Sequence, residues 1–267
     1  MSELDAKGVG DYFARAGTIS QWWTPGSGSL AFHYNAELHI LEDQFAIDPN
    51  WKVLDVGTGP GRFGALFAGR GCQVIGIDLN PDMLEMANDT ARGLGLEGQF
   101  EVKTGNAEDL SEFSDSSFDV VCCMELFDHL PDLHTALAEM RRVLKPDGHF
   151  LYTYVPTESL YGCLGNIYRW LRARTRPSEL MLSRTYSRNS ICSLLAESGL
   201  QPERYWGVGV FCVSAQTRLF GNNAIVRALT AIARAEARRW PYYSAPGIAR
   251  HGAHVVALAR PLPDAAS

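Results

Sequence analysis

Residues 53–62, which read VLDVGTGPGR, constrain the fold of this chain more than any other stretch. Apolar residues flank Asp55, and Gly57, Gly59 and Gly61 then alternate with other residues before a run of small and apolar ones. Glycine tolerates positive φ and lets a ligand approach the backbone closely, so the pattern predicts a buried strand that turns sharply into a helix. The backbone N–H groups at the start of such a helix favour an anionic group of a nucleotide-like ligand.

A second apolar run, residues 72–77, ends at Asp78, roughly 20 residues beyond the first acid. A carboxylate at the tip of the second strand is the expected partner of ribose hydroxyls. An ordinary strand–helix–strand unit with a solvated aspartate would show the same pattern. Gly59, Gly61 and Gly64 also fit the spacing of dinucleotide loops, so an NAD-dependent dehydrogenase stays open at this point.

The glycine stretch resembles the first motif, (V/I)LDxGxGxG, of the class I S-adenosylmethionine-dependent methyltransferases. Further segments resemble that family in the same order: VIGIDLNPDMLEMA (74–87), GNAEDL (105–110), SFDVVCCMELFDHLPD (117–132) and MRRVLKPDGHFLYTYVP (140–156). The core is most similar to the ubiquinone/menaquinone-type and natural-product branch. The resemblance implies a Rossmann-like, doubly wound α/β fold. Its seven-stranded, mostly parallel sheet has the last strand antiparallel, and helical lid elements are added to it.

The resemblance, together with the positions of these residues at strand ends, implies a site for S-adenosylmethionine. Asp78 is expected to accept both ribose hydroxyls, and Asp55 to orient the ammonium group of the methionine part. The loop residues expected beside the methionine part are Gly57, Thr58, Gly59 and Gly61. The residues expected around the adenine and the sulfonium are Leu79, Met83, Asn106, Ala107 and Met124. Asn106 stands where the family more often has aspartate.

Methyl transfer is a direct displacement, so the protein must hold the nucleophile at about 3–3.5 Å and, where needed, remove its proton. His129 follows the fourth predicted strand and is our candidate general base, with Asp128 as the alternative. Two other interpretations remain open: that His129 caps the next helix, and that proximity alone suffices. Glu125 and Asp128 alone are too few carboxylates for a divalent cation, so no metal site is expected.

The segments outside the matching core should recognise the methyl acceptor. We expect an N-terminal helical and aromatic lid at residues 1–50 and a donor-binding core at 51–156. Residues 157–267 complete the sheet and carry capping insertions at 157–186 and 214–250. Aromatic side chains suited to a flat acceptor are Trp22, Trp23, His33, Tyr34, Tyr161 and Tyr168, with Trp170 and Trp206 as further candidates. Packing of the lid is the simpler role for each of them.

The arginines at 169, 172, 174 and 176 could bind a carboxylate or phosphate of the acceptor, although a solvated helix face is the commoner reason for such a run. The same two interpretations apply to the arginines at 227, 234, 238 and 239.

Alternating apolar runs and helix signals predict the elements. Strands are expected near 52–56, 73–77, 99–103, 118–123, 149–155, 201–213 and 254–258. Helices are expected near 30–45, 61–70, 81–93, 133–143, 187–198 and 224–240. Ser187 is the expected N-cap of the fifth helix and Gly199 its C′ residue.

The amino-acid composition limits the kinds of partner that we expect this protein to bind. The 267-residue chain has a net charge of −6, which disfavours a broad nucleic-acid-binding surface. The six scattered cysteines lack metal-ligand spacing and are expected to be reduced thiols. Neither a signal peptide nor a run of about 18 apolar residues is visible, and we expect a cytoplasmic protein.

The sequence thus predicts methylation of O, N or C on a small, aromatic or quinone-like metabolite. The alternatives are an RNA or protein methyltransferase and a non-catalytic scaffold that binds S-adenosylmethionine. The aromatic N-terminal segment could pack on its own domain or on a second copy of the chain, as in a homodimer.

Overall fold

A computed structural model of the chain describes residues 31–175, 184–210 and 224–263. It contains a seven-stranded sheet in the order β3-β2-β1-β4-β5-β7-β6. The strands are β1 (Lys52–Val56), β2 (Gln73–Asp78), β3 (Phe100–Thr104), β4 (Phe118–Cys123), β5 (Leu144–Tyr154), β6 (Leu200–Val208) and β7 (His254–Pro261). The first five strands are parallel, and β7 pairs antiparallel with both β5 and β6. The Rossmann-like, doubly wound fold with an antiparallel last strand is confirmed.

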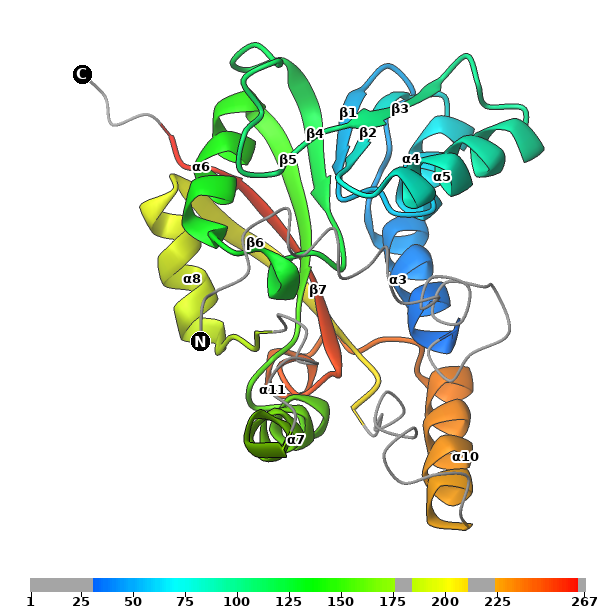
Figure 1. Ribbon diagram of the computed structural model, residues 1–267, viewed down its shortest axis with the longest axis vertical. Helices are drawn as coiled ribbons and strands as arrows, with labels where there is room; N and C mark the ends of the chain where they lie inside the picture. The colour runs from blue at the N-terminus through cyan, green and yellow to red at the C-terminus, as the bar shows by residue number, and fades with distance from the viewer. Residues whose placement is uncertain (1–30, 176–183, 211–223, 264–267) are drawn as a thin grey trace.

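Helices cover both faces of this sheet (Figure 1). The helical elements are α3 (Ala31–Gln44), α4 (Arg62–Gly69), α5 (Pro81–Gly93), η1 (Phe127–His129), α6 (Leu133–Val143), α7 (Leu160–Thr175), α8 (Arg188–Glu197), α10 (Ala224–Arg239) and α11 (Pro246–Ala249). Apolar residues of α3, α4 and α5 form one buried cluster with the sheet, and those of α6 and α8 form a second. In Figure 1, α7, α10 and α11 gather at the end of the sheet where β5 and β6 finish.

Local signals placed most of these boundaries correctly. The side chain of Asn80 caps α5 by accepting a hydrogen bond from the Asp82 N–H, and Pro81 occupies the first helical turn. Ser187 caps α8 as expected, and Gly199 follows this helix with φ +72°.

Two elements differ from the sequence expectation. The strand expected at 149–155 begins at Leu144, which pairs with Phe118 before an irregular stretch that resumes at Val120 and His149. The Lys-Pro-Asp-Gly segment therefore lies within β5 as an irregular stretch, across which the register with β4 shifts. Helix α7 was not predicted, although Leu160, Leu164, Ile167 and Leu171 recur at helical spacing among its 16 residues.

Among the described residues, no helix is long and apolar enough to cross a membrane.

Candidate functional site

A pocket lies over the carboxyl ends of the parallel strands, where open α/β sheets bind their ligands. The segments that follow β1, β2, β3 and β4 all contribute to its wall. The pocket is lined by Gly57, Thr58, Gly59, Pro60, Arg62, Phe63, Asp78, Leu79, Asn80, Met83, Gly105, Asn106, Ala107, Met124, Glu125, Leu126, His129, Leu130 and Pro131. Most residues predicted to bind the methyl donor therefore line one pocket, and His129 lines the same pocket.

The loop after β1 has the backbone that the glycine pattern predicted. Gly57, Gly59 and Gly61 have φ values of +69°, +53° and +82°. A Cβ atom on Gly57 would lie 2.7 Å from Leu126 Cδ2, so any other residue would be strained at this φ and would also displace the Leu126 side chain. The Thr58 N–H donates to the Ile77 carbonyl at 2.9 Å and ties the loop to β2. Gly61 is the N-cap of α4 and is not part of the pocket wall.

Asp55 supports this loop from below instead of facing the pocket. Its side chain is almost fully buried, and Oδ2 accepts hydrogen bonds from Thr58 Oγ1 at 2.7 Å and from the Gly64 N–H at 3.0 Å. Burial raises the pKa of Asp55 to about 6, although these hydrogen bonds oppose the shift. The carboxylate therefore fixes the shape of the loop, and its expected role toward the donor's ammonium group stays a prediction.

Asp78 lies at the end of β2 and does line the pocket. Its Oδ2 accepts the Gly59 N–H at 3.0 Å, and its Oδ1 accepts the Asn80 N–H at 2.9 Å. Burial raises the pKa of this carboxyl group, while the backbone N–H groups oppose the shift. Because each carboxylate oxygen has a second lone pair, both remain able to accept a further hydrogen bond from a ligand.

The wall beyond Asp78 is mostly apolar. Leu79 is one of the large apolar side chains that stay exposed, whereas Met83, Ala107 and Met124 are buried beneath the pocket surface. Asn106 contributes the polar part of this wall, and its Oδ1 accepts the Glu108 N–H at 3.1 Å. A flat apolar ring with polar edges fits between these residues.

The two candidate bases lie in the short helix η1. His129 lines the pocket, and its Nε2 is 3.4 Å from Asp128 Oδ2; both side chains are 15% exposed. Asp128 does not line the pocket. The interpretation of His129 as a helix cap is wrong, because Asp132 caps α6 by accepting a hydrogen bond from the Thr135 N–H.

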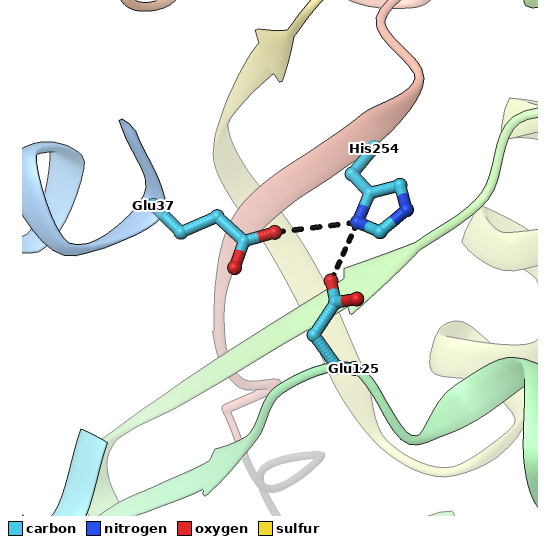
Figure 2. Close-up of side chains that lie close together, drawn as sticks. All are labelled: Glu37, Glu125 and His254. Atoms are coloured by element: carbon cyan, nitrogen blue, oxygen red, sulfur yellow. Dashed lines mark hydrogen bonds and ion pairs between the residues drawn. The ribbon is translucent and has the colours of Figure 1, made fainter. Parts of the chain in front are cut away.

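Sequence reasoning missed a buried cluster of charged residues beside the pocket. Figure 2 shows Glu37 of α3, Glu125 after β4 and His254 at the start of β7 pointing toward one another. Since both neighbours of His254 Nδ1 are carboxylate oxygens, Nδ1 donates to Glu125 Oε1 at 2.6 Å and to Glu37 Oε1 at 3.3 Å. Arg62 lies 3.9 Å from Glu37 Oε2 and lines the pocket, as does Glu125.

Burial and pairing act on the pKa values of this cluster in different directions. Burial raises the pKa of Glu37 to about 8, with the nearby charge of Glu125 adding to the shift. Burial opposes ionisation of Glu125 as well, but His254 outweighs it and lowers the pKa of Glu125. Glu125 in turn raises the pKa of His254 above its usual range, against the effect of burial. The cluster therefore holds a charged imidazolium–carboxylate pair out of water.

One sequence signal for this cluster was available. Glu37 precedes Ile40 and Leu41 by three and four residues, and both are fully buried, so an acid stands on the apolar face of α3. Glu125 follows β4 directly, and a strand end of this kind is a common site position.

Among the aromatic residues predicted to contact the methyl acceptor, few can be placed near the charged cluster. Tyr161 is half-buried, and its ring centroid lies 5.8 Å from that of His254. Trp206 is 2% exposed and packs in the core, so its candidacy as an acceptor wall is wrong, whereas Trp170 is exposed and stacks with Arg174. Trp22 and Trp23 lie outside the described residues, as do the side chains of His33, Tyr34 and Tyr168.

Most arginines that the structure describes in the two runs lie in solvent. Arg174, Arg234, Arg238 and Arg239 are exposed, as expected for solvated helix faces. Arg169 is partly buried, and burial lowers its pKa. The thiols of Cys72, Cys122, Cys123, Cys163 and Cys192 are free.

Known proteins resemble this chain most strongly around the pocket. A family profile described as a methyltransferase domain matches residues 54–152. Ubiquinone biosynthesis O-methyltransferase of Hahella chejuensis is 32% identical over 152 residues, which are 55% of this chain and 63% of that protein. The protein of the same name from Pseudomonas syringae pv. tomato is 31% identical over 172 residues, 63% of this chain and 72% of that protein. The chain thus spans less than two thirds of the length of several curated relatives.

The fold also recurs in a solved structure. A SAM-dependent methyltransferase of Thermotoga maritima, described as a possible histamine N-methyltransferase, superposes with a TM-score of 0.65 at 19% identity. The match covers 94% of this chain and 99% of the other and shows a shared fold. From the matching domain and the relatives, this chain belongs to the S-adenosylmethionine-dependent methyltransferases, and S-adenosylmethionine is its methyl donor.

Proposed function

We propose that this protein transfers the methyl group of S-adenosylmethionine to an O, N or C atom of a small, aromatic or quinone-like metabolite. The observation that carries the proposal is the single pocket that joins the glycine loop, Asp78 and Asn106 to His129. Ubiquinone biosynthesis O-methyltransferases among the relatives favour a quinone-like or phenolic acceptor. The donor supplies an electrophilic methyl group on a sulfonium, so the protein's task is to bind, orient and deprotonate the acceptor.

Different residues of the pocket are proposed to bind different parts of the methyl donor. Asp78 accepts the ribose hydroxyls through its remaining lone pairs. Gly57, Thr58 and Gly59 line the narrow end for the methionine part, where the missing Cβ of Gly57 leaves room. The residues proposed to surround the adenine are Leu79, Met83, Asn106 and Ala107. Met124 is proposed to lie near the sulfonium. Asp55 and Gly61 act indirectly, by holding the loop.

His129 is the candidate base because its ring reaches the pocket from the segment after β4. Asp128 lies 3.4 Å from Nε2 and acts through His129 by orienting its ring. The segments proposed to recognise the acceptor are 1–50, 157–186 and 214–250, and among their described residues Tyr161 has a half-buried ring. The free thiols favour a reducing compartment such as the cytoplasm.

The test is calorimetric titration with S-adenosylmethionine, S-adenosylhomocysteine and NAD, alongside Asp78→Ala and the matched control Asp82→Ala. We expect micromolar binding of the two sulfur nucleotides, a loss of at least tenfold in Asp78→Ala and no change in the control. A panel of catechols, hydroquinones and aromatic amines is then assayed for S-adenosylhomocysteine release. Binding of NAD alone would overturn the donor site, and tight donor binding with no turnover of any acceptor would support a scaffold.

A further inference from the structure

The charged cluster of Glu37, Glu125 and His254 joins three elements that are far apart in the sequence. One ligand atom from each residue, two carboxylate oxygens and an imidazole nitrogen, lies within 4.8 Å of the others. Figure 2 shows that the three side chains converge from α3, the segment after β4 and the start of β7. An imidazole with two carboxylates is a donor set that suits first-row transition metals more than Mg²⁺ or Ca²⁺, which prefer oxygen ligands alone.

The separations within the cluster suit a cation between the side chains. Bonds of about 2.0–2.2 Å to imidazole nitrogen and carboxylate oxygen place neighbouring ligand atoms about 3–3.5 Å apart. His254 Nδ1 is 3.3 Å from Glu37 Oε1, which is already within this range, and 2.6 Å from Glu125 Oε1. Only a small outward movement of the Glu125 carboxylate is needed.

The charge and the burial of this cluster also favour a bound cation. When the imidazole is neutral and both glutamates are ionised, the two carboxylates carry a charge of −2; Arg62 offsets part of this charge, and a bound cation would neutralise the rest. The Glu37 side chain is fully buried, and its Oε2 has no hydrogen-bond partner within the part of the chain that the structure describes. Arg62 approaches this Oε2 at 3.9 Å, so its guanidinium leaves the Oε1 side of the carboxylate to the cluster. A buried carboxyl group with an unsatisfied oxygen is costly even beside Arg62 and His254, and a cation in the cluster would offset part of this cost.

The backbone at Glu125 is strained in a way that serves the cluster. Glu125 has φ +59°, one of two positive φ values among the described non-glycine residues. Its N–H donates to Thr153 Oγ1 at 2.6 Å and holds this conformation in place. Strained backbone of this kind concentrates at functional sites, because the surrounding structure must offset it.

We propose that Glu37, Glu125 and His254 form a binding site for a divalent transition-metal cation that opens toward the methyl-donor pocket. Glu125 belongs to the pocket wall, so a cation held by it would lie beside the pocket. An acceptor with a hydroxyl or carbonyl oxygen can ligate the cation there, and this arm of the proposal rests on the proposed function. The competing interpretation is that Glu37, Glu125 and His254 bind no metal and form only a hydrogen-bonded ion cluster.

The experiment measures metal uptake directly and needs no acceptor. The full-length protein is treated with EDTA, dialysed and titrated with MnCl₂, ZnCl₂ or MgCl₂ by calorimetry. The loss of the free Mn²⁺ signal is followed by electron paramagnetic resonance. We expect one Mn²⁺ or Zn²⁺ per chain and much weaker Mg²⁺ binding. Glu125→Gln, Glu37→Gln and His254→Gln should each weaken Mn²⁺ binding at least tenfold.

Glu42→Gln is the matched control, because Glu42 is an acid on the same helix as Glu37 and lies 3.5 Å from the exposed His39. Titration with S-adenosylhomocysteine shows whether each variant is folded, and Glu125→Gln keeps the shape of the side chain. Retained nucleotide binding with lost Mn²⁺ binding supports the metal site. Mn²⁺ binding that is absent from the parent protein, or equal in Glu125→Gln and Glu42→Gln, overturns it. Loss of nucleotide binding by the parent protein would instead count against the proposed function.

Discussion

His254 Nδ1 lies 2.6 Å from Glu125 Oε1, although 129 residues separate the two in the chain. Glu37 completes the arrangement from a third element, 3.3 Å from the same nitrogen. The imidazolium thus sits between two carboxylates that have little contact with water. Removing one member of such a group leaves the others without compensation, so its energetics can be tested by single substitutions.

His254→Ala should lower the free energy of unfolding by about 3–5 kcal/mol, because the buried Glu125 carboxylate then loses the imidazolium that lies 2.6 Å from it. Urea unfolding measures the change, and His39→Ala, at an exposed position, should stay within about 0.5 kcal/mol of the parent protein. Adding Glu37→Gln to His254→Ala should recover part of the loss, since the second buried acidic group beside Glu125 is removed. Equal effects of the two histidine variants would contradict the cluster's role in stability.

Gly57→Ala should weaken S-adenosylhomocysteine binding at least tenfold and destabilise the fold by about 1–3 kcal/mol. The new Cβ would lie 2.7 Å from Leu126 Cδ2, and alanine would be held at φ +69°. Gly69→Ala is the control, because a Cβ there meets no atom within 4 Å. Leu126→Ala in the Gly57→Ala background should restore only part of the stability, since the backbone strain remains. Calorimetry and thermal unfolding follow both effects.

Asp55→Asn should flatten the pH dependence of stability. The pKa of Asp55 is about 6 in the folded protein and 3.8 in the unfolded chain. The folded state therefore binds the proton of this carboxyl group more tightly. The free energy of unfolding contributed by Asp55 is therefore largest below about pH 4 and falls as the pH rises to about 6. The slope of this contribution is at most about 1.4 kcal/mol per pH unit.

Urea unfolding of the parent protein and of Asp55→Asn between pH 4 and 7 measures this contribution as the difference between the two curves. Asp89→Asn, at an exposed position on α5, serves as the control. A difference curve that stays level, or that rises with pH, would refute the assignment.

His129→Gln should lower kcat by about 10²–10⁴-fold for a phenolic acceptor, the usual contribution of a general base. The affinity for S-adenosylhomocysteine should remain unchanged, because the donor residues are intact. Asp128→Asn should reduce kcat less than His129→Gln does, since the side chain 3.4 Å from the imidazole Nε2 positions the ring and does not line the pocket. His134→Gln on α6, an exposed position, should leave both parameters unchanged. Activity of His129→Gln close to that of the parent protein would favour catalysis by proximity alone.

The sequence by itself determined the local features around the donor pocket. Alternating glycines required positive φ at Gly57, Gly59 and Gly61, and the apolar runs placed β1, β2 and β4. The caps at Asn80 and Ser187 follow from hydrogen bonds between residues two or three apart. These features depend on backbone sterics and near neighbours, which a linear pattern records.

Only the tertiary structure decided the cluster of Glu37, Glu125 and His254 and the burial of Trp206. Because β7 runs antiparallel to β5, its first residue, His254, lies at the edge where the parallel strands end, beside Glu125. Glu37 reaches the same point because α3 packs its buried residues against the sheet. Such contacts depend on strand order and helix docking across more than 100 residues, and no local spacing encodes them.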